Sequence, residues 1–412
     1  SDTNSARSLP SPKKCPPCAE TNAPEVPDNR RKQAPQVRHG GIFPCITTAN
    51  LLRRGVDAHR DTKRNPRRGK HTVVVERGAG SAARYLDDAY EAAGATLGTA
   101  QDALGAELVM KVRAPDSDEL AQMKPGTVVV GMLDPFDAEG LARMAAAGLT
   151  GFALEAAPRI TRAQSLDVLS SQANLAGYKA VLLAAHHYGR LIPMMMTAAG
   201  TLKAARAVVL GTGVAGLQAI ATAKRLGAVV EASDVRPAAR EQVESLGAKF
   251  IDMPFETDEE REIAQGTGGY ARPMPPAWMA RQAALVSERC KQADIVITTA
   301  LIPGRPAPTL VSAETVAAMK PGSVLVDLAV ERGGNCPLSE KGLIVEKHGV
   351  TIIGLTNLPG LVATDASALY ARNILDFLKL IIDADGALAI QRDDEIVAAC
   401  LMCEGGNVTR RT

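Results

Sequence analysis

The chain contains 412 residues, which is enough for two or three domains with hydrophobic cores of their own. Its 47 basic and 45 acidic side chains nearly balance, so the composition gives no reason to expect binding to nucleic acid. No stretch approaches 18 uncharged apolar residues, and residues 1–20 lack the apolar segment of a secretory signal. We therefore expect neither a transmembrane helix nor secretion.

The first seventy residues differ from the rest of the chain. They contain 15 Lys and Arg, 6 Asp and Glu, and nine prolines, with almost no periodic apolar pattern. Such a basic, proline-rich composition is typical of a disordered tail. We predict that residues 1–70 form an atypical segment that is either disordered or the product of a misread reading frame.

From residue 71 onward, buried strands alternate with helices. Continuous Val and Leu runs predict strands, and helical periodicity separates them. In the first half the predicted strands are His71–Glu76, Glu107–Val112, Thr127–Leu133 and Thr150–Glu155, and the predicted helices are Tyr85–Ala93 and Ala138–Ala147. In the second half the strands are Arg206–Leu210, Val229–Ser233, Asp294–Thr299, Ser323–Leu328 and Thr351–Gly354, with a helix over Ala215–Leu226.

The two halves also share a short sequence echo. Met-Lys-Pro-Gly precedes a buried strand at residues 123–126 and again at residues 319–322. We predict an α/β protein with two Rossmann-like domains, each built on a parallel sheet covered on both faces. The first domain comprises residues 71–170 plus 366–412, and the second comprises residues 171–365. Two long helices, Ser171–Arg190 and Asp365–Ile382, are expected to join them, after which residues 388–397 rejoin the first domain.

The strongest chemical signal is the motif Gly211-Thr-Gly213-Val-Ala-Gly216. A buried strand precedes it, a helix follows it, and Asp234 ends the next strand, eighteen residues past Gly216. This context is typical of a dinucleotide-binding turn. Gly211 permits the tight turn, Gly213 lets the backbone approach a pyrophosphate, and Gly216 allows close packing of helix and strand. Asp234 should accept hydrogen bonds from ribose hydroxyls and repel a 2′-phosphate, which favours NAD(H) over NADP(H), although Arg236 lies nearby.

Three weaker patterns allow more than one interpretation. Gly78-Ala-Gly80 follows a strand but lacks the distal acid, so we interpret it as a structural turn. The polar segment Arg159–Ser170 lies at a strand end, where α/β sheets bind ligands, but Asp167 or Ser170 could simply cap the following helix. The segment Ala264–Pro276 is rich in glycine and proline, which suits a mobile lid or a solvated connector.

The seven cysteines indicate a reducing compartment. Their odd number in a chain of this length argues against a disulfide scaffold. Cys15 and Cys18 form one CxxC pair, and Cys400 and Cys403 form another. Two such pairs could bind zinc, but they lie far apart and lack the usual glycines, so we predict no metal site.

Several stretches resemble the soluble NAD(H)-binding alpha subunit of proton-translocating NAD(P) transhydrogenases, which is related to alanine dehydrogenase. The resemblance is densest over residues 158–373 and includes PRITRAQSLDVLSS, VVLGTGVAGLQA, ITTALIPGRPAP and VLVDLAVERGGNCPLS. Alanine dehydrogenase shares the fold and some glycines but not the RxxxxQxxD cluster in this form. Residues 1–70 depart from the family pattern, which opens with a βα unit.

The resemblance implies roles for individual residues and for partners. It implies that Arg159, Gln164 and Asp167 take part in catalysis by holding the nicotinamide and its ribose. The implied cofactor-binding residues are Arg159, Gln164, Asp167, Ser170, Gly211, Gly213, Val214, Gly216, Asp234, Arg236, Gly269, Tyr270, Gln282, Ala300 and Leu301. It further implies a homodimer on the cytoplasmic face of the membrane, an NADP(H)-binding partner subunit and a membrane subunit that carries protons.

Two other functions stay open at this point. A stand-alone amino-acid dehydrogenase of the alanine dehydrogenase type would need an acid or base, usually histidine, in the first domain. The chain has no histidine between His71 and His186, although Lys111 could bind a substrate. A non-catalytic NAD-binding module would differ from a transhydrogenase subunit only in lacking hydride exchange with partners.

Overall fold

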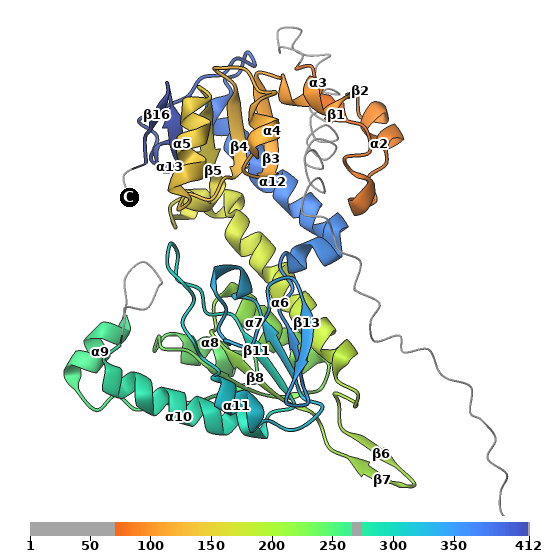
Figure 1. Cartoon of the computed structure of the whole chain (residues 1–412), viewed down its shortest axis with the longest axis vertical. Helices are drawn as coiled ribbons and strands as arrows, with labels where there is room; N and C mark the ends of the chain where they lie inside the picture. Colours follow the sequence, from red (N-terminus) through yellow and green to blue (C-terminus); the bar gives the residue numbers. More distant parts are fainter. Residues whose placement is uncertain (1–70, 266–273, 411–412) are drawn as a thin grey trace, which may run out of the picture. The chain divides into compact units, whose positions relative to one another are not determined.

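The computed structural model describes residues 71–265 and 274–410, and within them the chain forms two α/β domains (Figure 1). The predictions for residues 1–70 lie outside the described residues. Aliphatic side chains and alanine dominate both cores, since only 3% of the residues are aromatic. None of the described helices is long and apolar enough to cross a bilayer.

The first domain contains a five-stranded sheet with the strand order β16-β15-β5-β4-β3. Its strands are β3 (Leu108–Arg113), β4 (Val128–Met132), β5 (Thr150–Ala153), β15 (Leu401–Glu404) and β16 (Asn407–Val408). Strands β3, β4 and β5 are parallel, whereas β15 and β16 extend the sheet in antiparallel fashion. The helices around this sheet are α4 (Ser117–Leu120), α5 (Ala138–Ala146) and α13 (Glu395–Cys400). A separate parallel pair, β1 (Val74–Glu76) and β2 (Thr96–Gly98), is accompanied by α2 (Asp87–Ala92) and α3 (Ala100–Leu104).

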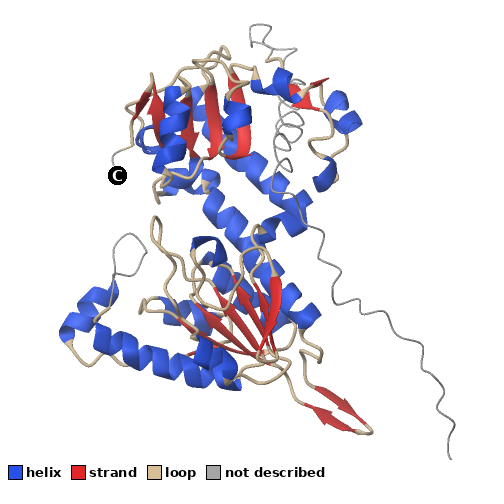
Figure 2. Ribbon diagram, viewed as in Figure 1, coloured by secondary structure: helices blue, strands red, loops and turns tan. Residues whose placement is uncertain are grey.

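The second domain contains a seven-stranded sheet with the order β10-β9-β8-β11-β12-β14-β13, in which only β13 is antiparallel (Figure 2). Its strands are β8 (Arg206–Leu210), β9 (Val229–Ser233), β10 (Lys249–Phe250), β11 (Ile295–Thr298), β12 (Val324–Asp327), β13 (Ile344–Lys347) and β14 (Val350–Ile353). Its helices are α7 (Val214–Arg225), α8 (Ala239–Ser245), α9 (Asp258–Gln265), α10 (Pro276–Gln292) and α11 (Ala313–Ala317).

Two long helices, α6 (Val168–His187) and α12 (Ala363–Ile381), connect the sheets in the chain. They pack against each other, and the Ser171 hydroxyl donates to Asn373 Oδ1 at 2.8 Å. Helix α6 also packs closely on α7, because a Cβ at Gly177 would overlap the backbone carbonyl of Ala215. The absence of a side chain at Gly177 therefore sets how near α6 lies to the helix that follows the glycine motif.

The repeated Met-Lys-Pro-Gly sequence forms the same turn in both domains. Gly126 and Gly322 adopt φ of 90° and 81°, a region that favours glycine. The Gly126 N–H donates to Gly148 O at 2.8 Å, and the Gly322 N–H donates to Gly349 O at 2.7 Å. Each turn therefore ties the start of one strand to the turn before its neighbour, which gives the sequence echo a structural basis.

The fold class predicted from the sequence is confirmed, with differences at the sheet edges. Strands β13, β15 and β16 pair in antiparallel fashion and were not predicted. They are short and lack the continuous apolar runs that identify buried parallel strands in a sequence. The hairpin of β6 (Met195–Thr197) and β7 (Gly200–Leu202) was not predicted either. Its residues are exposed in the described structure, so no buried face marks the pattern of alternation in the sequence.

Candidate functional site

The glycine motif forms a turn between β8 and α7. Gly211 adopts φ of 91°, and a Cβ there would lie 2.7 Å from Thr299 Oγ1. A Cβ at Gly216 would overlap the carbonyl oxygen of Gly211, so α7 can approach the strand only because residue 216 has no side chain. The structural roles predicted for these two glycines, a tight turn and close packing, are therefore confirmed.

Gly213, at the start of α7, leaves the backbone accessible. A Cβ at this position would have no heavy atom within 4 Å among the described residues. Gly213 is the N-cap residue, and no side chain caps the first turn of the twelve-residue helix that begins at Val214. Uncapped N–H groups and the helix dipole attract anions, so this backbone can accept a pyrophosphate.

Asp234, just beyond the end of β9, is held next to the turn by five hydrogen bonds. Its Oδ2 accepts the Thr212 N–H at 2.8 Å and the Thr212 hydroxyl at 2.9 Å. Arg236 donates from its backbone N and Nε to Oδ1, each at 2.9 Å, and from Nη2 to Oδ2 at 2.8 Å. Burial alone would raise the pKa of the Asp234 carboxyl, but the charge and hydrogen bonds of Arg236 and the backbone donors outweigh it and lower the pKa. The Asp234 carboxylate is therefore ionised at neutral pH. Its side chain is 7% exposed and lies against the glycine turn.

The segment after β11 lies against the same turn. The Thr299 hydroxyl donates to Gly211 O at 2.9 Å, and a Cβ at Gly211 would lie 3.1 Å from the Ala300 nitrogen. Leu301 follows with 45% of its surface exposed. The structure thus brings Ala300 next to the glycine motif, from which it is separated by almost ninety residues in the sequence.

The polar segment Arg159–Ser170 forms the entry to α6. Asp167 caps this helix: its Oδ1 accepts the Ser170 N–H at 2.9 Å, and its Oδ2 accepts the Ser170 hydroxyl at 2.6 Å. Arg159 and Gln164 are exposed, Gln164 within a 3₁₀ helix over Thr161–Leu166. The capping alternative is therefore confirmed for Asp167, while the nucleotide roles of these four residues stay predictions.

Of the three remaining predicted residues, the structure describes only Gln282. Gln282 is 8% exposed within α10, which packs against β8, and this burial favours a packing role. Gly269 and Tyr270, and most of the lid predicted over 264–276, lie outside the described residues, whereas Pro276 begins α10.

Sequence reasoning missed two buried residues, Asp327 and Asn335, which hold the loops around Ala300. Asp327, at the end of β12, is fully buried and accepts five hydrogen bonds. Asn335 is also fully buried and bonds both the N–H and the carbonyl of Ala300. The sequence does show an acid at a strand end followed by Gly-Gly-Asn. This pattern alone does not predict which groups these two side chains bond.

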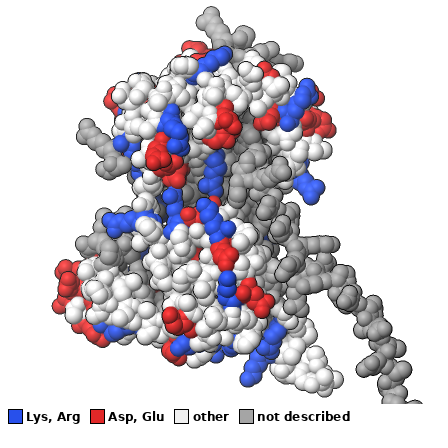
Figure 3. All heavy atoms as spheres, viewed as in Figure 1, with Lys and Arg blue, Asp and Glu red and all other residues white. Residues whose placement is uncertain are grey.

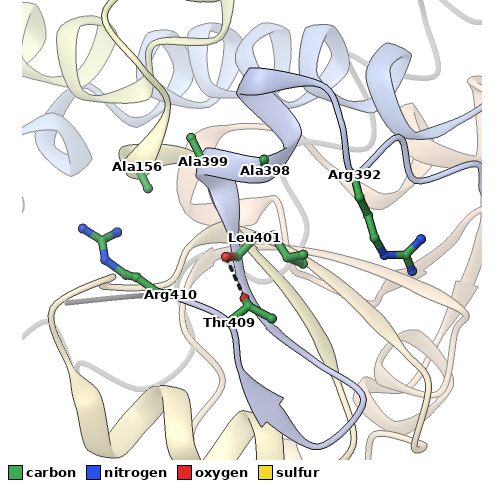
Figure 4. Close-up of a pocket in the computed structure, with 7 residues that line it drawn as sticks. All are labelled: Ala156, Arg392, Ala398, Ala399, Leu401, Thr409 and Arg410. Carbon is green, nitrogen blue, oxygen red and sulfur yellow. Dashed lines mark hydrogen bonds between the residues drawn. The ribbon is translucent and has the colours of Figure 1, made fainter.

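A pocket of about 360 Å³ lies in the first domain, away from the glycine motif in the sequence (Figure 4). Its two guanidinium groups already have partners: Arg392 pairs with Glu404, and Arg410 lies 4.8 Å from the centre of the Phe136 ring. None of the predicted nucleotide residues lines it. We therefore do not assign it to the candidate site.

Among the described residues, neither the cysteines nor the surface charges define a further site. Cys400 and Cys403 are buried, and burial raises the pKa of the Cys400 thiol to about 12. The other predicted pair, Cys15 and Cys18, lies outside the described residues. On the face shown in Figure 3, basic and acidic side chains of the described residues are interspersed.

Comparison with known proteins identifies the relatives of this chain. The N-terminal domain of the alanine dehydrogenase/PNT family matches residues 62–176, and the C-terminal domain of that family matches residues 180–411. An NAD(P) transhydrogenase alpha subunit from Rhodospirillum rubrum is 51% identical over 345 residues, which cover 82% of this chain and 89% of the relative.

Two solved structures resemble most of the chain. A transhydrogenase from Sinorhizobium meliloti has a TM-score of 0.75 and 50% identity, covering 88% of this chain and 94% of its own. An L-alanine dehydrogenase has a TM-score of 0.69 and 26% identity, covering 89% of this chain and 92% of its own. The chain is thus similar to proteins of both activities, and markedly more so in sequence to the transhydrogenases.

Proposed function

Because the chain belongs to the alanine dehydrogenase/PNT family, we propose that it is the NAD(H)-binding alpha subunit of a proton-translocating NAD(P) transhydrogenase. The observation that carries this proposal is the open backbone of Gly213 at the uncapped start of α7, next to an ionised Asp234. Identity of 51% to a relative named as a transhydrogenase alpha subunit supports the choice of reaction.

The residues around the turn fit a dinucleotide without a 2′-phosphate. The N–H groups of the first turn of α7 would hold the pyrophosphate, and Asp234 would accept from the adenosine ribose hydroxyls in exchange for some of its five present donors. Arg236, the nearby cation that could attract a 2′-phosphate, is instead paired with Asp234. This pairing supports NAD(H) over NADP(H).

In the proposed reaction, hydride passes between NAD(H) on this chain and NADP(H) on a partner subunit, coupled to proton movement through a membrane subunit. No side chain then needs to act as acid or base, so the protein contributes orientation and exclusion of water. The exposed Gln164 and Arg159 precede Asp167 at the capped start of α6, where they could align the two nicotinamides.

We also propose a homodimer that docks on the cytoplasmic face of the membrane through its partner subunits. The β6–β7 hairpin supports a protein–protein contact, because Met194, Met196 and Leu202 are 61%, 75% and 47% exposed. The word "subunit" in the names of the relatives also supports assembly with other chains.

The proposed reaction is tested by supplying the partner. The purified chain alone should give no exchange between NADH and an NADP analogue, and addition of an NADP(H)-binding transhydrogenase subunit should restore it. Exchange by the chain alone would contradict the proposal. So would NADH binding without any exchange after partner addition, which would indicate a non-catalytic NAD-binding module.

Gln164→Asn tests the alignment role within that mixture. Rapid-mixing kinetics should show hydride transfer slowed on the order of a hundredfold, because a shift of about 1 Å in the reacting groups has an effect of that size. NADH affinity should change less than tenfold, as for one lost neutral hydrogen bond of roughly 0.5–1.5 kcal/mol. Gln101→Asn, at an exposed position in α3, is the matched control. Unchanged transfer with weakened NADH binding would demote Gln164 to a plain contact.

The structural likeness to L-alanine dehydrogenase makes an amino-acid dehydrogenase the second candidate. Lys111, the residue that could bind its substrate, is 5% exposed and forms an ion pair with Glu119. An ammonium group already paired in this way is poorly placed to bind a substrate carboxylate. NADH oxidation with pyruvate and ammonia by the chain alone would favour this candidate, and its absence would favour the transhydrogenase.

A further inference from the structure

A short loop after β11 is closed by one buried side chain. The loop comprises residues 300–308 and presents Leu301 and Ile302, which are 45% and 38% exposed. Asn335 Nδ2 donates to Ala300 O at 2.9 Å and to Pro308 O at 2.7 Å, and its Oδ1 accepts the Ala300 N–H at 3.1 Å. One amide group therefore ties the two ends of the loop together.

The backbone carbonyl of Asn335 also bonds the residues that follow this loop. It accepts the N–H groups of Leu310 and Val311 at 2.8 and 3.0 Å. The residue is fully buried, and its side-chain amide uses both of its donors. A buried amide bonded in this way fixes the backbone that it contacts, because leaving those groups unpaired is costly.

Asp327 holds Asn335 in turn. Its Oδ2 accepts the N–H groups of Asn335 and Cys336 at 2.9 and 3.1 Å, and the Ser339 hydroxyl at 2.8 Å. Its Oδ1 accepts the N–H of Ala329 at 3.0 Å. The carboxylate, fully buried at the end of β12, thus anchors the loop that carries Asn335 to the rigid sheet.

The strand order indicates which part of a dinucleotide this loop would meet. From β8 the chain continues to β9 and β10 on one side of the sheet, then returns to β11, β12 and β14 on the other. The switch point lies between β8 and β11, where open α/β sheets bind ligands. Asp234 follows β9 and marks the adenosine side, so the other half of the molecule must extend towards the end of β11, where Ala300 lies.

We propose that Asn335 is a positioning residue that holds the Ala300 peptide in place for the nicotinamide half of the bound dinucleotide. This inference rests on the proposed binding of NAD(H) at the Gly211–Gly216 turn. Asn335 acts through Ala300 and not by contact with the nucleotide, because it is fully buried. The adenosine half depends on Asp234 and the turn, so it should bind independently of Asn335.

The test compares NADH with ADP-ribose, which lacks the nicotinamide base, by calorimetric titration of the full chain. Asn335→Asp keeps the shape of the side chain but replaces both N–H donors with an acceptor facing two carbonyl oxygens. We expect NADH affinity to fall about tenfold or more, as for about 1.4 kcal/mol of lost interaction, while ADP-ribose affinity changes less than twofold. Asn407→Asp, the same substitution at an exposed position in β16 of the first domain, is the matched control and should alter neither affinity.

Each other outcome overturns the inference. Equal losses of NADH and ADP-ribose affinity would show a merely structural role, and unchanged NADH affinity would show no role. If Asn335→Asp does not fold, as judged by thermal unfolding, Asn335→Ser allows the same comparison, because it removes the amide and keeps the backbone hydrogen bonds. Failure of the unmodified chain to bind either ligand would refute the proposed function itself, and this inference with it.

Discussion

The two domains share a strand-and-turn pattern but differ at the carboxyl ends of their strands. Both use the Met-Lys-Pro-Gly turn with matching hydrogen bonds. At the end of β8 in the second domain, the chain turns at Gly211 and leaves the backbone of Gly213 uncapped. In the first domain, side chains of the chain itself bond backbone groups near the carboxyl ends of β3 and β4.

Three hydrogen bonds from side chains satisfy backbone groups near these strand ends, and an ion pair lies beside them. The Tyr370 hydroxyl, from α12, donates to Lys111 O at 2.7 Å and accepts the Met132 N–H at 3.1 Å. Glu155 Oε1 accepts the Asp134 N–H at 2.7 Å. Lys111 pairs with Glu119. A repeated scaffold therefore does not imply a repeated site, because function depends on which backbone groups remain available at the strand ends.

The largest effect is expected from Gly216, the last glycine of the motif, and the contrast with Gly213 sharpens it. Gly216→Ala places a Cβ onto the Gly211 carbonyl, so α7 must shift. We expect a loss of stability of about 1–3 kcal/mol, as for other overpacked sites, together with loss of NADH binding. Gly213→Ala, where a Cβ meets open space, should keep the thermal midpoint and weaken NADH only. Equal losses of stability in the two variants would contradict the account, in which Gly216 is needed for packing and Gly213 for access of the nucleotide to the backbone.

Asp234→Ala is expected to have the next largest effect. The change removes a charged acceptor for the ribose hydroxyls and, with it, the carboxylate that would repel a 2′-phosphate. Fluorescence titration should show NADH affinity reduced roughly 10- to 100-fold, as for a charged hydrogen bond, and a narrower gap between NADH and NADPH. Asp252→Ala, which removes an exposed partner of Arg240 in the same domain, is the control. It should change neither the NADH affinity nor the preference for NADH over NADPH. An unchanged preference for NADH would place the discrimination elsewhere.

The first domain should respond to pH through Glu155. Burial raises the pKa of this carboxyl to about 7, although hydrogen bonds from backbone donors oppose the shift. The folded state then binds the proton more tightly than the unfolded state, so stability from this group is present below pH 4.5 and is lost as the pH rises through 7. Glu155→Gln should remove up to about 3 kcal/mol of this dependence between pH 5 and 8 in denaturant titrations.

The control for this pH effect is Glu139→Gln, at an exposed carboxyl on α5. It should leave the pH dependence of stability as in the unmodified chain. A pH profile that is the same for Glu155→Gln and the unmodified chain would show that Glu155 is ionised in the folded protein at neutral pH.

The sequence predicted those features that depend on residues close together in the chain. The parallel strands were visible as continuous apolar runs, and the glycine motif was visible because its neighbours along the chain complete it. Asn335 was not visible, because its partner Ala300 lies thirty-five residues earlier in the sequence and only the sheet brings them together. The long helix α10 was also missed, since it follows a glycine- and proline-rich segment that obscures its beginning.

We infer that, among residues 71–265 and 274–410, only the second domain offers a dinucleotide site. This claim is tested most directly by titrating the purified chain with NADH and with NADPH under the same conditions and measuring both affinity and stoichiometry. We predict one saturable NADH site per chain, abolished by Gly216→Ala, and much weaker binding of NADPH. Two NADH sites per chain, or equal affinity for the two nucleotides, would contradict the account.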